Sequence, residues 1–226
     1  MRKSYFITAI DTDAGKSIAT GLLARYLQEH GVRVITQKIA QTGCTGVSED
    51  IETHRRIMGV PLFPEDEVGL TCPYVFPFPA APQLSAELAG GEIDLETIRR
   101  ATLLLEGKYD CVLTEGVGGL MVPLAGDRTV LDYMERFPQP AVVVTNARLG
   151  SVNHTLLTLE ALHRRGIETV GMVYNNHIET DPAITADTAL TLRRFLTRSY
   201  PQAAFVEIGR WQPGNKTPDF SVLFEK

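Results

Sequence analysis

The chain has 226 residues, of which 44% are hydrophobic and 22% are charged, and its formal net charge is -5. These proportions exclude a disordered, collagen-like or coiled-coil chain. The negative charge argues against a surface built to neutralise nucleic-acid phosphates or anionic lipids, so we expect neither a nucleic-acid partner nor a membrane partner. We expect one domain spanning residues 1–226, because a chain of this length can bury a sufficient core without a metal or a disulfide.

Short apolar runs alternate along the chain with segments of helical periodicity. The first strand is predicted over Tyr5–Ile10, and the helix after it carries an apolar face and ends at Gly31. The further predicted strands are Val32–Lys38, Tyr109–Thr114, Ala141–Thr145, Thr169–Tyr174 and Ala204–Ile208. The further predicted helices are Ile51–Met58, Asp94–Glu106, Ser151–Arg165 and Ala183–Thr197.

The strands are continuous apolar runs rather than alternating ones, as at residues 142–144. This pattern is typical of a parallel sheet with helices on both faces, and it predicts a three-layer α/β fold. The stretch from Val60 to Pro82 contains six prolines and is too rich in proline for a central strand or helix. We interpret it as a long surface excursion, which in a compact domain is usually functional.

A phosphate-binding loop is predicted at residues 9–17, which read A-I-D-T-D-A-G-K-S between the first strand and the first helix. Backbone N–H groups at a helix start attract an anion, Lys16 adds a positive charge, and the Ser17 hydroxyl can bind Mg²⁺. The general pattern G-x-x-x-x-G-K-[ST] has glycine where this chain has Ile10, so the loop is a variant of that pattern. The fold is therefore expected to be that of a P-loop nucleoside triphosphatase.

Three charged residues are placed to complete this site. Glu115 follows the apolar residues 111–114 and precedes the glycine-rich run 116–119, at the strand edge where ligands bind in such sheets. Lys38 ends the second strand and is either a solvated strand terminus or a charge that stabilises a transferring phosphoryl group. Asp50 is either a second metal-facing carboxylate or a residue that complements a helix dipole.

Two classes of nucleotide-binding protein lack support in the sequence. The partitioning and septum-site ATPase switches carry a second lysine five residues before the loop lysine, where this chain has Asp11. Guanine-specific GTPases need N-K-x-D, which is absent from the sequence. Adenine is the expected base, read by Asn175 or Asn176, although two asparagines after a strand also commonly form a turn.

The cysteine pattern bears on location. Cys44, Cys72 and Cys111 are odd in number and have no C-x-x-C spacing, which is typical of reduced thiols. The apolar stretch near the N-terminus is too short for a signal peptide, and no apolar run reaches the roughly 18 residues of a membrane span. We expect a cytoplasmic protein.

Taken together, six motifs resemble those of the dethiobiotin synthetase family. They are D-T-D-A-G-K-S at 11–17, K-I-A-Q-T-G at 38–43, A-A-P at 80–82, E-G-V-G-G at 115–119, L-G-S-V-N-H-T at 149–155 and G-M-V-Y-N-N at 171–176. They run in the family's order over most of the chain. The chain departs from the family at Arg148, where lysine is frequent, and at Gly209, where proline is usual.

The resemblance implies a homodimer with its sites at the subunit interface, using ATP, Mg²⁺, carbon dioxide and diaminopelargonic acid. It implies that a carbamate of the diamine attacks the γ-phosphate and that the second amine then displaces phosphate from the mixed anhydride. Such chemistry needs no protein nucleophile. It depends on positioning and on positive charge at the phosphoryl group.

Roles follow from the resemblance position by position. Lys38 resembles the catalytic lysine, and Lys16 is the loop lysine that acts with it. The implied metal ligands are Ser17, Asp50 and Glu115, and the implied substrate contacts are Thr12, Lys38, Thr42, Gly150 and Asn153. The implied nucleotide contacts are Asp13, Ala14, Gly15, Lys16, Ser17, Ile18, Asp50, Glu115, Gly116, Val117, Gly118, Asn175, Asn176, Gly209, Arg210 and Trp211.

Two alternatives stay open at this point. One is an amide-forming ATPase of the cobyrinic acid synthase type, which normally carries a further glutaminase domain. The other is an ATP-driven dimerisation switch of the partitioning class that binds a partner protein. The sequence assigns no role to His54, His154 or His163.

Overall fold

The structure is a computed structural model that describes residues 3–177 and 181–224. Its strands are β1 (Ser4–Ala9), β2 (Val34–Lys38), β3 (Gln41–Thr42), β4 (Val75–Phe76), β5 (Cys111–Glu115), β6 (Pro123–Ala125), β7 (Arg128–Thr129), β8 (Ala141–Asn146), β9 (Thr169–Asn175) and β10 (Ala204–Ile208). Its helices are α1 (Lys16–Glu29), α2 (Glu49–Met58), α3 (Pro64–Glu67), α4 (Pro82–Leu88), α5 (Leu95–Glu106), α6 (Val130–Arg136), α7 (Ser151–Arg164), α8 (Pro182–Ser199) and α9 (Ser221–Phe224).

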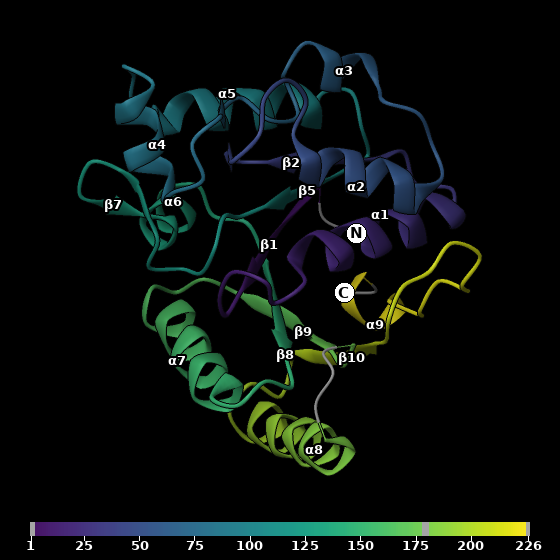
Figure 1. Ribbon diagram of the computed structural model, residues 1–226. Coiled ribbons are helices and arrows are strands. Elements are labelled where there is room, and N and C mark those ends of the chain that lie inside the picture. Colours follow the sequence, from purple (N-terminus) through teal and green to yellow (C-terminus); the bar gives the residue numbers. More distant parts are fainter. Residues whose placement is uncertain (1–2, 178–180, 225–226) are drawn as a thin grey trace.

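A six-stranded parallel sheet in the order β10-β9-β8-β1-β5-β2 forms the centre of the molecule (Figure 1). The predicted three-layer α/β fold is confirmed, and the predicted strands and helices agree with the observed ones to within about two residues at their ends. Since the six strands are parallel, their carboxyl ends lie at one edge of the sheet. Lys38, Glu115 and Asn175 end three of these strands and therefore share that edge.

Alternation along β2 shows which helices cover which face. The Thr36 hydroxyl lies 3.0 Å from Nδ1 of His54 on α2, whereas the amide of the next residue, Gln37, donates to the Ile98 carbonyl of α5 at 3.3 Å. Successive side chains of a strand point to opposite faces. Helices α2 and α5 therefore lie on opposite sides of the sheet.

The other half of the sheet follows the same division. The hydroxyls of Thr145 on β8 and Thr155 on α7 lie 2.7 Å apart, and the Tyr174 hydroxyl of β9 donates to the Thr185 carbonyl of α8 at 2.8 Å. Helices α5, α6, α7 and α8 cover one face, while α1, α2 and α9 cover the other (Figure 1). Both faces of the sheet are thus covered, which explains why every residue of β8 is buried.

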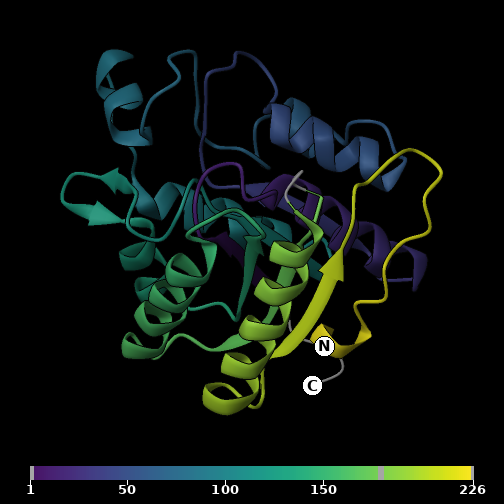
Figure 2. The ribbon, with the colours of Figure 1, turned by 60° about the horizontal axis from the view of Figure 1, so that its bottom comes forward.

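The proline-rich excursion contributes no strand to the central sheet, but it contains short regular elements. It contains α3, which begins at Pro64, and β4, which pairs in parallel with β3 outside the central sheet. Proline is well tolerated in the first turn of a helix because its missing N–H has no partner there. The excursion leads into α4, which lies beside the β6–β7 hairpin on one side of the molecule (Figure 2).

The three cysteines lie in the interior of the protein. Cys44, Cys72 and Cys111 are free and buried, and burial raises the pKa of Cys72 and of Cys111 to about 12. Within the described part of the chain, no helix combines the length and the apolarity needed to cross a membrane.

Candidate functional site

The loop between β1 and α1 has the geometry of a phosphate-binding loop. Gly15 precedes α1 with a φ of 94°, in the left-handed region that favours glycine. A Cβ atom built at Gly15 would lie 2.1 Å from Nδ2 of Asn175, so a larger residue would also displace that side chain. Within the described residues, no side chain caps the first N–H groups of α1, which leaves them available for an anion.

Lys16 lies buried at the start of α1, where its side chain folds back along the loop. Its ammonium group donates to the Asp11 carbonyl at 3.0 Å. Burial, followed by repulsion from Lys38, lowers the pKa of Lys16 to about 8. An incoming phosphate group would stabilise its positive charge, which the protein alone compensates poorly.

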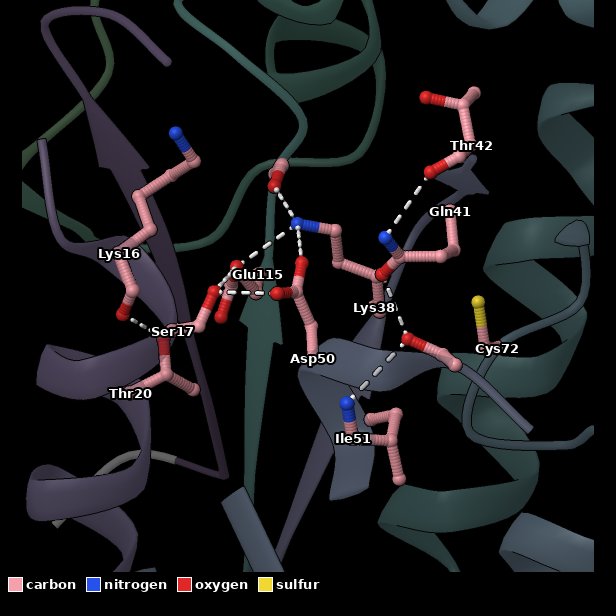
Figure 3. Close-up of polar contacts among 12 residues, drawn as sticks. Lys16, Ser17, Thr20, Lys38, Gln41, Thr42, Asp50, Ile51, Cys72 and Glu115 are labelled. Atoms are coloured by element: carbon pink, nitrogen blue, oxygen red, sulfur yellow. Dashed lines mark hydrogen bonds and ion pairs between the residues drawn. The ribbon is translucent and has the colours of Figure 1, made fainter. Parts of the chain in front are cut away.

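Four side chains converge at the carboxyl ends of the neighbouring strands (Figure 3). The Lys38 ammonium lies 2.8 Å from Oε1 of Glu115 and 2.5 Å from Oδ2 of Asp50, and it donates to the Gly116 carbonyl at 3.0 Å. The Ser17 hydroxyl lies 2.7 Å from Oδ1 of Asp50 and 3.0 Å from Oε1 of Glu115. Residues that are far apart in the sequence thus form one charged cluster beside the loop.

The electrostatics of this cluster keep Lys38 and Glu115 ionised. Burial alone raises the pKa of Glu115, but the charge of Lys38 and the hydrogen bonds from His54 and Lys38 outweigh burial and hold that pKa well below its usual range. Burial likewise lowers the pKa of Lys38, but the carboxylates of Glu115 and Asp50 outweigh this effect and raise it. The cluster therefore presents the Lys38 ammonium and the Glu115 carboxylate to the cleft in their charged forms.

The donor set fits a magnesium ion bound together with phosphates. One hydroxyl and two carboxylates are hard oxygen ligands, and Mg²⁺ usually binds through one or two carboxylates plus substrate oxygens rather than in a cage made by protein alone. Among the described residues there is no group of three or more His, Cys, Asp or Glu side chains that could hold a metal without a substrate. Ser17, Asp50 and Glu115 are thus suited to an ion that arrives with a nucleotide.

A cleft of about 840 Å³ opens above the cluster. Sequence reasoning predicted many of its lining residues, namely Thr12, Asp13, Gly15, Lys16, Ser17, Ile18, Lys38, Thr42, Asp50, Glu115, Val117 and Gly118. It gave no individual role to Ala40, Gln41, Val122 or the residues of the opposite wall at 79–82. The A-A-P motif at 80–82 and the functional interpretation of the proline-rich excursion were the signals for that wall.

The residues predicted to contact adenine gather beside the cleft. Asn175, Gly209, Arg210 and Trp211 line a small hollow of about 80 Å³. Ile18 and His177 line both this hollow and the main cleft, and sequence reasoning missed His177.

The predicted adenine contacts differ in how their polar atoms are used. The Asn175 amide donates to the Ala14 carbonyl at 3.3 Å, and its oxygen accepts from the backbone N–H of His177 at 3.3 Å. Asn175 therefore ties the phosphate loop to the end of β9. Asn176 lies at the same corner, where its backbone N–H donates to the Ile208 carbonyl at 2.9 Å. The Trp211 indole nitrogen is buried without a hydrogen-bond partner in the described residues.

Two of the predicted substrate contacts lie elsewhere. Gly150 and Asn153 line a separate hollow of about 800 Å³ between α7 and α8, outside the main cleft. The two regions are connected through Arg148, whose guanidinium forms an ion pair with Asp11 of the phosphate loop. Within one chain, the structure does not bring Gly150 or Asn153 to Lys38.

The chain is similar to known proteins over most of its length. Residues 3–200 match the model of a family described as an AAA domain. The ATP-dependent dethiobiotin synthetase BioD 2 of Pasteurella multocida is 47% identical over 205 residues, which cover 91% of this chain and 96% of that protein. The ATP-dependent dethiobiotin synthetase BioD of Chlorobaculum tepidum is 53% identical over 192 residues, which cover 85% of this chain and 80% of that protein.

One solved structure shares the fold at low sequence identity. It is the pNOB8 ParA protein bound to nonspecific DNA, with a TM-score of 0.53 and 14% identity, and the match covers 96% of this chain and 89% of that one. At this level of identity the likeness concerns the arrangement of strands and helices alone.

Proposed function

The chain belongs to the dethiobiotin synthetase family, and we propose that its cleft closes a ureido ring on 7,8-diaminopelargonic acid with carbon dioxide and ATP. The protein is thus an ATP-dependent ligase of biotin biosynthesis. The relatives at 47% and 53% identity match nearly the whole chain, and this extent supports the assignment.

The proposed reaction has two bond-forming steps after the diamine has taken up carbon dioxide as a carbamate. A carbamate oxygen attacks the γ-phosphorus of ATP, the bond from that phosphorus to the β,γ-bridging oxygen breaks, and ADP leaves with the electron pair. The second amine then attacks the carbonyl carbon of the mixed anhydride, loses a proton and expels phosphate. Both steps require alignment of bound groups and stabilisation of negative charge rather than a protein nucleophile.

The observation that carries this proposal is the convergence of two buried lysines on one cleft beside a phosphate loop. Lys16 and Lys38 line the cleft together with Thr12 and Thr42. We assign Lys16 to the phosphates of ATP, Lys38 to the transferring phosphoryl group and the carbamate oxygen, and the two threonines to the diamine substrate. The four-carbon stem of Lys38 allows its ammonium to turn from the carboxylates toward a phosphoryl oxygen.

Magnesium and the nucleotide base have their own proposed positions. Ser17, Asp50 and Glu115 would hold Mg²⁺, which when bound neutralises charge on the β- and γ-phosphates. The base would lie at the hollow beside Asn175 and Trp211, where the unpartnered indole N–H offers a donor.

The proposed active assembly is a homodimer. Leu149 is 94% exposed and Leu157 is 61% exposed on the α7 side of the molecule, and Gly150 and Asn153 line the hollow there. A second chain placed against this side would cover these apolar side chains and could bring Gly150 and Asn153 to its own diamine site. The buried, free cysteines support a reducing, cytoplasmic location as part of the same proposal.

Phosphate release tests the proposed reaction. The protein is expected to release phosphate from Mg-ATP and bicarbonate only when diaminopelargonic acid is present, with one ureido product detected by mass spectrometry for each phosphate. DNA, vesicles or a second protein should not stimulate release, which separates this function from that of a partitioning switch. Equal phosphate release with and without the diamine would contradict the proposal.

A further inference from the structure

A row of buried hydrogen bonds reaches Glu115 from the side opposite the cleft. Nη1 of Arg55 donates to the Thr36 hydroxyl oxygen at 2.9 Å, that hydroxyl lies 3.0 Å from Nδ1 of His54, and Nε2 of His54 lies 2.8 Å from Oε2 of Glu115. Arg55 is itself fixed by Asp66, through two bonds of 2.8 Å each. All five side chains are buried, and neither the sequence motifs nor the proposed reaction accounts for this row.

The chemistry of these side chains determines which atom donates and which accepts in each hydrogen bond of the row. Arginine can only donate, so the Thr36 oxygen accepts from Arg55. The ionised Glu115 carboxylate can only accept, so Nε2 of His54 carries a hydrogen. The Thr36 hydroxyl hydrogen is then directed to Nδ1, which accepts it. Each donor in the row thus meets an acceptor, and the His54 ring is held in the form with its hydrogen on Nε2.

The two oxygens of the Glu115 carboxylate therefore have different roles. Oε2 is held from behind by His54, while Oε1 faces the cluster, 2.8 Å from Lys38 Nζ and 3.0 Å from Ser17 Oγ. A carboxylate fixed through one oxygen presents the other in a defined direction. Supporting hydrogen bonds of this kind orient metal ligands and affect metal affinity.

We infer that His54 is a positioning residue for Glu115, held by Thr36 and Arg55, and that it orients this carboxylate for a divalent cation bound with the nucleotide. The inference rests on the proposed function, because it takes Glu115 as a metal ligand. His54 does not line the cleft and is fully buried, so its effect passes through Glu115 alone. His54 thereby supports the metal site without contacting the metal.

Two substitutions of His54 separate positioning from packing. His54→Gln keeps an N–H donor near the place of Nε2, whereas His54→Asn keeps a polar atom near Nδ1 but loses the donor to Glu115. The affinity of Mn²⁺ for the ADP-loaded protein is measured by electron paramagnetic resonance. His54→Asn is expected to weaken it about tenfold or more, while His54→Gln stays within about threefold of the wild type. ADP binding in the presence of a chelator should be unchanged in both variants.

Glu115→Gln distinguishes failure of this inference from failure of the proposed metal site. If Glu115→Gln leaves the Mn²⁺ affinity unchanged, the metal role of Glu115 is wrong and the inference falls with it. If Glu115→Gln weakens Mn²⁺ binding but His54→Asn does not, or if His54→Gln weakens it as much as His54→Asn does, the positioning role is overturned while the proposed function stands.

Thr36 provides a second route if His54→Asn does not fold. Thr36→Val preserves the shape of the side chain but removes the hydroxyl that fixes the His54 ring, and Thr36→Ser retains that hydroxyl. The Mn²⁺ affinity is expected to fall at least threefold in the valine variant and to remain near the wild-type value in the serine variant. Equal affinities in the two folded variants would overturn the inference.

Discussion

Replacement of Lys38 by methionine is expected to lower the turnover of diamine-dependent phosphate release by about 100- to 1,000-fold, the usual effect of removing one preorganised donor from a developing negative charge. Lys38 is almost fully buried, and its ammonium lies in the cleft beside the phosphate loop. Methionine has a similar length but no charge. Steady-state phosphate release at saturating ATP and diamine measures the effect.

The affinity for nucleotide should change much less than turnover in this variant, because Lys16 and the start of α1 are intact. A loss confined to turnover means that Lys38 stabilises the transition state more than the bound substrate. The matched control is Lys108→Met, which removes a lysine that pairs with Glu65 and does not line the cleft. Turnover within about twofold of the wild type in Lys38→Met would contradict the catalytic role.

Asp66→Ala is expected to lower the free energy of unfolding by about 3–5 kcal/mol, because it leaves the Arg55 charge buried without its partner. The Asp66 carboxylate accepts two bonds from Arg55, one from the Thr71 hydroxyl at 2.7 Å and one from the backbone N–H of Phe63 at 2.7 Å. The Thr71 carbonyl in turn accepts from the backbone N–H of Lys38 at 2.7 Å. Denaturant unfolding measures the loss.

Acid should reduce the difference between Asp66→Ala and the wild type. Burial alone raises the pKa of Asp66, but Arg55 outweighs burial and holds it below the usual range. The stabilisation is therefore fully present above the unfolded-state value of about 3.9 and is lost as the pH falls through the lower native value. The control is Asp110→Ala, which breaks the exposed ion pair with Arg33 and should change stability far less. Equal losses in the two variants would contradict the stabilising role of the buried Arg55–Asp66 pair.

The fold and the centre of the site could be predicted because their signals are local. The apolar runs at residues 142–144 and 171–174 indicate buried parallel strands, whichever strands they pair with. The residues on both sides of Lys16 indicate a strand, a turn and a helix in that order. Parallel strands then place Lys38 and Glu115 at the same edge of the sheet, and the observed register puts the two residues directly side by side. The shared position of Lys38 and Glu115 could therefore be predicted without knowledge of side-chain packing.

The support behind the site could not be predicted, because it depends on contacts between distant segments. His54 meets Glu115 only through the packing of α2 against β2, and a single histidine in a helix is usually structural. Asp66 lies in the proline-rich excursion, and the sequence has no hydrophobic periodicity there from which the path of the chain could be predicted. The hydrogen bond from the Asn175 amide to the phosphate loop could not be predicted for the same reason, because the two segments are far apart in the sequence.

Isotope tracing tests whether a carbamate oxygen receives the γ-phosphoryl group, because the oxygen atoms of carbon dioxide can be followed into the products. The wild-type protein is given ATP, diaminopelargonic acid and carbon dioxide labelled with ¹⁸O, and the reaction is stopped before the label exchanges with water. We expect one labelled oxygen in each released phosphate and the other in the ureido carbonyl. Unlabelled phosphate accompanied by a labelled ureido product would contradict this expectation.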